Sequence, residues 1–236
     1  MSTTTVKKIL VCEDEDSIRS FVVVNLQRAG YTVYEAGSGE EALRLIEQDP
    51  AMDIALLDVM LPGIDGFETC HRLRQANGTM GIIMLTALAQ EAEKVNGLQM
   101  GADDYVTKPF GTAELIARVD ALYRRLSSVR QEPAAYLEQI QRGELTLNLR
   151  TRQLLVRGAA VELTHVEYQL MEFFFRHPGT PVSRTELLHA VWGADYYGDD
   201  KIVDVNVRRL RMKVESDPSQ PQLIQTVWGR GYQWNG

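Results

Sequence analysis

Carboxylate, hydroxyl and lysine side chains stand directly after short apolar runs of this sequence. Glu13 and Asp14 follow the first run, Asp58 follows a second and Thr86 a third, while Lys108 lies in a Thr-Lys-Pro segment further along. The runs cover residues 9–12, 54–57 and 82–85. Continuous apolar runs bounded by polar residues are typical of strands buried on both faces of a parallel sheet. Since polar residues beyond the carboxyl ends of such strands meet in one crevice, we expect these side chains to lie together.

Three carboxylates in one crevice repel one another. At a separation of about 4 Å and an effective dielectric constant of about 20, each like-charge pair costs about 4 kcal/mol. A bound divalent cation removes that cost, and hard oxygen ligands favour Mg²⁺ over Zn²⁺. A lysine and a hydroxyl at the same rim then suit a phosphoryl group.

Each of these residues has a simpler interpretation when it is taken alone. An isolated Asp after a strand is most often a helix cap or a turn former, which would account for Asp14 and Asp58. Lys108, before Pro109, would be a solvated surface lysine. A chance arrangement is nevertheless the poorer explanation of the whole set, because the sites occur in the right order and each at its own strand end.

The same segments resemble a bacterial response-regulator receiver domain, over roughly the first half of the chain. The matching stretches are VCEDED (11–16), LLDVMLPG (56–63), MLTA (84–87) and ADDYVTKPF (102–110). The resemblance implies that Asp58 is the phosphoacceptor of a sensor histidine kinase. It also implies that Asp14 and Asp58 bind Mg²⁺ directly, that Glu13 does so at least partly through water, and that the backbone carbonyl of Met60 is a further ligand.

The resemblance assigns roles to four more residues around Asp58. Lys108 would pair with the phosphoryl oxygens, and the small Ala87 would leave access to the site. Thr86 would turn its hydroxyl towards the phosphate, and Tyr105 would fill the space that Thr86 leaves.

Strand and helix patterns alternate along residues 1–126. Helices are expected at 17–29, 39–48, 66–75, 90–100 and 112–126, the second opened by a Ser38/Glu41 capping box. Five strands with five helices predict a doubly wound α/β domain, a (βα)5 fold with parallel sheet order 2-1-3-4-5.

Residues 127–142 lose this periodicity, contain Pro133 and are predicted to be a linker. A second domain is predicted over 143–236. Antiparallel strands are expected at 145–149, 153–157 and 160–163, helices at 165–176, 184–192 and 201–215, and a terminal hairpin at 223–227 and 232–234. Capping boxes, Thr164 with Glu167 and Ser183 with Glu186, open the first two helices. This is the pattern of an α+β winged helix-turn-helix.

The second half resembles the effector domain of the OmpR/PhoB family, so that the likeness spans nearly the whole chain. The stretches are LTHVEYQLMEFF (163–174), VSRTELLHAVWG (182–193), VDVNVRRLRMKVE (203–215) and IQTVWGRGYQW (224–234). The resemblance implies binding of double-stranded DNA at promoter half-sites, and contact of the loop 194–200 with RNA polymerase.

In the helix expected at 201–215, helical periodicity predicts a buried stripe and an opposite face that contacts DNA. The stripe holds Val203, Val207, Leu210 and Val214, and the DNA-reading set is Val205, Asn206, Arg208, Arg209, Arg211 and Lys213. Val205 could touch a thymine methyl group, while the polar side chains reach base edges or phosphates. The alternative is a solvated basic stripe.

Arg230, in the hairpin turn, is expected to contact the minor groove. The chain departs here from a common family pattern, because Trp228 stands where an arginine is frequent; Trp228 could instead pack in the core or the wing.

The resemblance also implies a homodimer on phosphorylation, through the fourth helix, fifth strand and fifth helix of the receiver. The expected charged pairs are Lys94 with Glu114, Asp103 with Arg118 and Asp104 with Arg125, around an apolar patch of Val95, Leu98 and Ile116. Taken singly, each pair could be a surface salt bridge with no role in dimerisation, contributing under about 1 kcal/mol to stability.

Composition agrees with a DNA-binding protein once the charge is divided. The net charge of −7 lies in residues 1–142, with 14 basic and 21 acidic side chains, while residues 143–236 hold 11 of each. No apolar run is long enough for a membrane span, and Cys12 and Cys70 lack metal-ligand spacing, so we expect a cytoplasmic protein with free thiols.

The interpretation is a phosphorylation-controlled transcription factor with Mg²⁺ as cofactor, and not an enzyme. A phosphohydrolase of the haloacid-dehalogenase type would need a second Asp two residues after Asp58, where Met60 stands. A dimeric DNA-binding regulator that works without phosphorylation is the remaining alternative.

Overall fold

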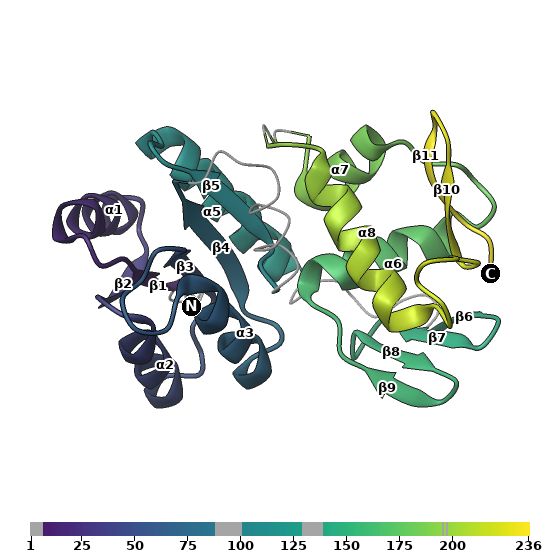
Figure 1. Cartoon of the computed structure of the whole chain (residues 1–236), viewed down its shortest axis with the longest axis horizontal. Coiled ribbons are helices and arrows are strands. Elements are labelled where there is room, and N and C mark those ends of the chain that lie inside the picture. The colour runs from purple at the N-terminus through teal and green to yellow at the C-terminus, as the bar shows by residue number, and fades with distance from the viewer. Residues whose placement is uncertain (1–6, 88–100, 129–138, 195, 197) are drawn as a thin grey trace, which may run out of the picture. The chain divides into compact units, whose positions relative to one another are not determined.

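The computed structural model describes residues 7–87, 101–128, 139–194, 196 and 198–236 (Figure 1). The chain forms two compact units, Met1–Ser127 and Ser128–Gly236. The helix expected at 90–100 and most of the predicted linker lie outside the described residues.

The first unit contains a parallel sheet of five strands. These are β1 (Lys8–Cys12), β2 (Thr32–Ala36), β3 (Ile54–Asp58), β4 (Gly81–Thr86) and β5 (Asp104–Thr107), in the order β2-β1-β3-β4-β5. The predicted strand order is therefore confirmed. The three central strands consist of side chains that are almost all fully buried, as continuous apolar runs predict.

Helices cover both faces of this sheet (Figure 1). They are α1 (Asp16–Arg28), α2 (Gly39–Gln48), α3 (Gly66–Ala76) and α5 (Thr112–Ser128). One core joins α1 and α5 to one face through residues such as Leu26, Leu56 and Val119, and α2 and α3 lie on the other face. Each fully buried aliphatic side chain contributes about 1.5–3 kcal/mol to this packing.

The second unit begins with an antiparallel sheet of four strands: β6 (Gln139–Arg142), β7 (Leu145–Asn148), β8 (Gln153–Val156) and β9 (Ala159–Val161). The prediction of a linker over 127–142 was wrong for its last four residues, because 139–142 form β6. Their sequence, QIQR, is polar at three of four positions, and pairing with β7 rather than burial holds the strand in place.

Three helices and a hairpin complete the second unit: α6 (His165–Arg176), α7 (Arg184–Trp192), α8 (Lys201–Val214), β10 (Ile224–Val227) and β11 (Gly231–Trp234). Both predicted capping boxes are present, at Thr164/Glu167 and Ser183/Glu186. Trp234 is fully buried against Phe175 of α6, with ring centroids 4.9 Å apart. The hairpin is thereby fixed to the helical core, and the winged helix-turn-helix prediction is confirmed.

Candidate functional site

Three carboxylates meet at the carboxyl ends of β1 and β3. Glu13, Asp14 and Asp58 each place a carboxylate oxygen within 4.8 Å of the others. Glu13 and Asp58 are 1% and 4% exposed, whereas Asp14 faces solvent. Parallel pairing sets this geometry, because β1 and β3 lie side by side and end at the same edge of the sheet.

Lys108, just beyond β5, reaches into this cluster. Its Nζ lies 2.6 Å from an oxygen of Glu13 and 3.0 Å from an oxygen of Asp58. Burial raises the pKa of Glu13, against the hydrogen bond from Lys108. Burial alone would lower the pKa of Lys108, but its bonds to Glu13 and Asp58 outweigh that effect and the pKa is raised. Lys108 is therefore held as a cation.

The cluster fits a hard divalent cation. Within the described part of the chain, Lys108 pairs with two of the three carboxylates, so the cluster keeps a negative charge. The carboxylate donors are all oxygens, which is the donor set of Mg²⁺ rather than of Zn²⁺. The exposure of Asp14 gives such an ion a route in from solvent.

The other residues expected around Asp58 also lie at this edge. Thr86 and Tyr105 are buried, on β4 and β5, and Ala87 is exposed just after β4. The backbone N–H of Lys108 donates to the carbonyl of Thr86 at 2.6 Å. Beside Lys108 there is an opening of about 460 Å³, lined by Ser17, Ile18, Phe21, Ala87, Lys108, Pro109 and Phe110. The Met60 side chain is 64% exposed on the loop after Asp58.

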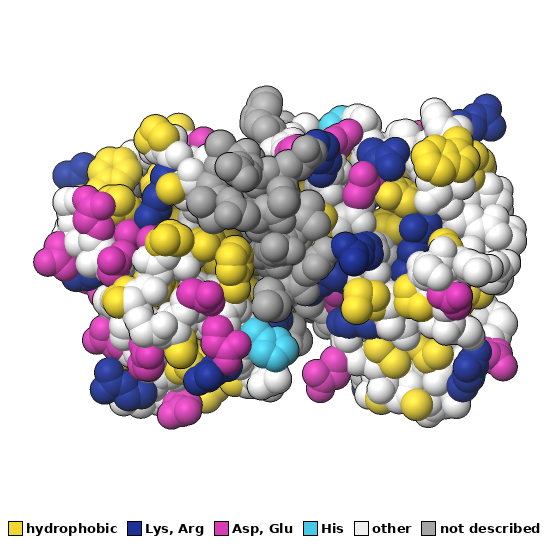
Figure 2. Space-filling view, in the orientation of Figure 1, with side chains coloured by type: hydrophobic (Ala, Val, Ile, Leu, Met, Phe, Trp, Pro, Cys, Tyr) yellow, Lys and Arg dark blue, Asp and Glu magenta, His cyan; other side chains and the backbone are white. Residues whose placement is uncertain are grey.

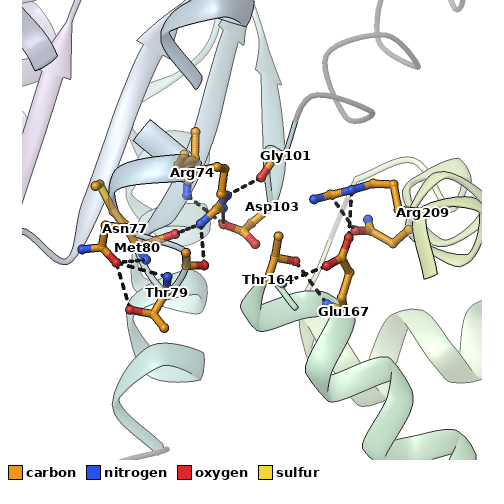
Figure 3. Close-up of polar contacts among 12 residues, drawn as sticks. Arg74, Asn77, Thr79, Met80, Gly101, Asp103, Thr164, Glu167 and Arg209 are labelled. Atoms are coloured by element: carbon orange, nitrogen blue, oxygen red, sulfur yellow. Dashed lines mark hydrogen bonds and ion pairs between the residues drawn. The ribbon is translucent and has the colours of Figure 1, made fainter. Parts of the chain in front are cut away.

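The proposed dimer face differs from expectation at Asp103. Its side chain is fully buried, pairs with Arg74 of α3 and accepts from the N–H of Ile82 at 2.8 Å (Figure 3). Asp103 therefore caps the start of β4 inside the unit and is not exposed in this structure, and its expected pairing with Arg118 in a dimer stays a prediction. Sequence reasoning missed Arg74, which also donates to the carbonyl of Gly101 at 2.7 Å.

The remaining members of that face lie on β5 and α5. Arg118 lies 3.3 Å from Asp104 and 2.9 Å from Glu114 of its own chain. Arg125 is 7% exposed and Ile116 is partly exposed. Lys94, Val95 and Leu98 lie outside the described residues.

Helix α8 has its predicted buried stripe, but its exposed face is narrower than predicted. Val205, Asn206 and Arg209 are 5%, 0% and 7% exposed. Asn206 donates to the carbonyl of Ile202 at 2.8 Å, and Arg209 lies 3.0 Å from the buried carboxylate of Glu167 on α6 (Figure 3). Because both α6 and α7 pack on α8, its buried surface is wider than one stripe. These three side chains therefore do not lie on the exposed face where they were predicted, and their contact with DNA stays a prediction.

Two other basic residues of α8 are tied to neighbouring elements. Arg211 donates to the carbonyl of Ile224 at 2.6 Å and to the hydroxyl of Thr226 at 2.9 Å, both on β10. Lys213 contacts Glu167 at 2.6 Å. Glu167 thus closes the amino-terminal cap of α6 and also binds two cations of α8. The capping pattern identified Glu167 as a cap, and nothing in the sequence signalled its second role.

Arg208 and Met212 remain on the solvent side of α8, one turn apart, and Met212 is 66% exposed. Lys and Arg side chains gather over this helix with apolar side chains beside them (Figure 2). At the tip of the hairpin Trp228 is 92% exposed and Arg230 is exposed as well. The alternative that Trp228 packs in the core is therefore excluded.

No helix among the described residues has the length and apolar character needed to cross a membrane. Models of two known protein families match the chain. The model of the response regulator receiver domain matches residues 9–120, and the model of the C-terminal part of transcriptional regulatory proteins matches residues 158–234.

Solved structures of related proteins resemble the chain over one or both units. A C128S mutant of RitR is 26% identical with a TM-score of 0.80, covering 98% of this chain and 100% of its own. DrrB, an OmpR/PhoB homologue of Thermotoga maritima, is 30% identical with a TM-score of 0.50 over 98% and 100% of the two chains. A CheY-like receiver of Methanospirillum hungatei is 28% identical, with a TM-score of 0.51, over 52% of this chain and 98% of its own.

Proposed function

We propose, since this chain belongs to the OmpR/PhoB family of response regulators, that phosphorylation of Asp58 controls its binding to promoter DNA. The chain is a two-component transcriptional regulator, with the architecture of a regulator rather than of an enzyme. The observation that carries the finer proposal is the pocket itself: Asp58 is buried beside Glu13 and Asp14, and Lys108 lies 3.0 Å from its carboxylate.

The phosphodonor is the phosphohistidine of a sensor kinase or a small acyl phosphate. A carboxylate oxygen of Asp58 forms a bond to phosphorus, the bond from phosphorus to the donor nitrogen or oxygen breaks, and its electron pair leaves with the donor. Lys108 pairs with the phosphoryl oxygens. Glu13, Asp14, Asp58 and the carbonyl of Met60 would hold Mg²⁺, which supplies charge neutralisation at the phosphoryl group when bound.

The opening beside Lys108 supports access by a protein donor. Its lining is mainly apolar, with Phe21 44% exposed at its rim, and Ala87 adds no bulk. Such a surface suits a helical kinase domain that brings its phosphohistidine to Asp58.

The switch uses residues next to the pocket. The hydroxyl of Thr86 turns towards the new phosphate, and Tyr105 occupies the space left behind. An added charge of about −1.5 to −2 is sufficient to bias such a two-state element. The favoured state exposes a dimer face on β5 and α5, where Asp104, Glu114, Ile116, Arg118 and Arg125 contribute.

The second unit binds double-stranded DNA through α8 and the hairpin. Arg208 and Met212 supply the major-groove contacts, with Arg211 and Lys213 beside them, and Trp228 and Arg230 lie at the hairpin tip. A dimer places two such units on repeated half-sites. RNA polymerase is the proposed partner of the loop 194–200, which lies partly outside the described residues, and a regulator of bacterial promoters works in the cytoplasm.

The test is label transfer from acetyl phosphate to Asp58→Asn, in the presence of Mg²⁺. We expect the variant to take up no label and to keep the wild-type circular dichroism spectrum. Asp65→Asn is the matched control: Asp65 caps α3 on the same loop, and asparagine caps helices equally well. Wild-type labelling of Asp58→Asn would refute the assignment.

A further inference from the structure

Arg19 of α1 holds the backbone of the two residues that carry the pocket's first carboxylates. Its Nη1 donates to the carbonyl of Glu13 at 2.6 Å and lies 3.4 Å from the carbonyl of Asp14. The side chain is 19% exposed, so that it is fixed between α1 and the end of β1 rather than free in solvent.

The guanidinium charge of Arg19 is matched elsewhere. Its Nη2 pairs with Asp16, one turn earlier on α1, and its Nε lies 3.8 Å from Glu35 of β2. Within the described part of the chain, Arg19 therefore contacts the pocket through backbone carbonyls rather than through the carboxylates. The planar fork of arginine is suited to this, because several donors reach different acceptors at once.

The hydrogen bonds from Arg19 to these two carbonyls, a clamp on the loop after β1, oppose the repulsion among the three carboxylates. Glu13, Asp14 and Asp58 are held within 4.8 Å of one another, and like charges at that distance push their segments apart. Asp58 is fixed by the buried end of β3, whereas Glu13 and Asp14 lie on the loop after β1. Repulsion from Asp58 would therefore displace this loop more easily than the end of β3.

We propose that Arg19 is a positioning residue for the Mg²⁺ site, holding Glu13 and Asp14 in place against repulsion from Asp58. The inference rests on the proposed function, because it concerns the same site. Loss of a residue that orients metal ligands commonly lowers metal affinity about 10- to 100-fold.

The positioning role of Arg19 and its positive charge predict opposite changes in the affinity for Mg²⁺ when the side chain is removed. Removing a cation near an acidic pocket should, by electrostatics alone, strengthen binding of Mg²⁺. Removing a clamp should weaken it. A change in Mg²⁺ affinity therefore separates the two roles by its sign.

The experiment is calorimetric titration of the full chain with Mg²⁺, comparing wild type with Arg19→Gln and Arg19→Lys. We expect the Kd for Mg²⁺ to rise about 10-fold or more in Arg19→Gln. Arg19→Lys should show a smaller rise in the same direction, since lysine keeps the charge but not the fork. Arg72→Gln is the control, because it removes an arginine of the same unit whose pair with Glu68 is exposed.

Labelling from acetyl phosphate supplies the second readout. At saturating Mg²⁺ we expect Arg19→Gln to recover most of its labelling, which a general loss of structure would not allow. If Arg19→Gln does not fold by circular dichroism, Arg19→Lys decides the matter: it keeps the charge, so electrostatics alone predicts an unchanged Kd, whereas loss of the fork should raise it.

Unchanged or tighter Mg²⁺ binding by the folded variants would overturn the role of Arg19 while leaving the proposed function intact. Absence of Mg²⁺ uptake by the wild-type protein would instead overturn the proposed function, and the role of Arg19 with it.

Discussion

Basic residues of α8 differ in what their side chains contact. Arg208 is exposed to solvent, whereas Arg209, the next residue, is buried against Glu167 of α6. A side chain in solvent can neutralise a phosphate, and a buried ion pair holds two helices together. Adjacent arginines should therefore have separable effects on DNA binding and on stability.

We expect Arg208→Ala to lower the slope of log affinity for DNA against log salt by about 1, because one phosphate or base contact is lost. Its stability should stay within about 0.5 kcal/mol of wild type. Arg209→Ala should leave the salt slope unchanged and destabilise the second unit by about 1–3 kcal/mol, since the buried Glu167 carboxylate loses one of its two cations and keeps Lys213.

Urea unfolding followed by tryptophan fluorescence measures the stability difference selectively. All three tryptophans, Trp192, Trp228 and Trp234, lie in the second unit. A reduced salt slope in Arg209→Ala, with no loss of stability, would show that Arg209 contacts DNA after all.

Tyr232 gives the second unit a predictable alkaline limit. Burial, and then a hydrogen bond from its hydroxyl to Asp204 at 2.7 Å, raise the pKa of Tyr232 to about 12. Below the ordinary tyrosine pKa of about 10, the folded and unfolded chains both keep this proton. Above it, the unfolded chain releases the proton while the folded chain retains it, so that stability falls as the pH rises through the folded pKa.

We expect the free energy of unfolding to drop between about pH 10 and 12, by roughly 2–3 kcal/mol from this group, because one pKa unit corresponds to about 1.4 kcal/mol. Other tyrosines and lysines titrate in the same range, so Tyr232→Phe is the reference. Its stability should be lower at neutral pH and should fall less steeply across this interval. Parallel pH curves for the two proteins would contradict the prediction.

At the level of elements, the start of α3 packs directly on the strand that carries the phosphoacceptor. A Cβ on Gly66, the first residue of α3, would lie 2.0 Å from the carbonyl oxygen of Asp58. Glycine is needed at position 66 because the nearest atom belongs to the backbone of Asp58, which cannot move away by changing a rotamer as a side chain can. The helix thereby buttresses the end of β3.

We expect Gly66→Ala to destabilise the first unit by about 1–3 kcal/mol and to slow labelling by acetyl phosphate, since α3 or the Asp58 backbone must shift. Gly78→Ala is the control: nothing lies within 4 Å of a Cβ there, and its backbone is not left-handed. That variant should be neutral or more stable by about 0.4–1 kcal/mol. Thermal unfolding by circular dichroism measures both, and equal behaviour of the two variants would contradict the buttress.

Elements were predictable from sequence where a local signal marked them. Apolar runs gave the central strands, and capping pairs gave the starts of α2, α6 and α7, because these signals lie within a few residues. Strand β6 was missed since its partner, not its own composition, defines it. Similarly, helical periodicity predicted one buried stripe on α8, but it did not show that two helices, α6 and α7, pack on α8.

The carboxylates and the lysine of the pocket were predictable for the same reason, whereas residues that hold other elements in place were not. Glu13, Asp58 and Lys108 each follow a recognisable strand, and parallel topology brings them together. Arg19, Arg74 and Glu167 act on groups in other elements, and a single polar residue carries no mark of a distant partner. Their roles depend on contacts that exist only in the folded chain.

At the level of the whole molecule, Asp58 and α8 lie in different compact units, and the proposed route from a phosphoryl group to DNA binding is dimerisation of the chain. Ile116 is partly exposed on α5, between Glu114 and Arg118. A glutamate at this position would place a charge in an apolar dimer contact and add repulsion near Glu114. Neither effect should reach Asp58.

We therefore expect Ile116→Glu to take up label from acetyl phosphate at the wild-type rate but to remain monomeric in analytical ultracentrifugation. Wild type should gain roughly 10²-fold or more in affinity for a duplex with two half-sites, because dimerisation makes the second contact intramolecular, and the variant should lose most of that gain. Gln75→Glu, which adds the same charge on exposed α3, is the control. A donor-dependent dimer of Ile116→Glu would move the interface elsewhere, and a wild-type dimer that forms equally without donor would favour the phosphorylation-independent regulator.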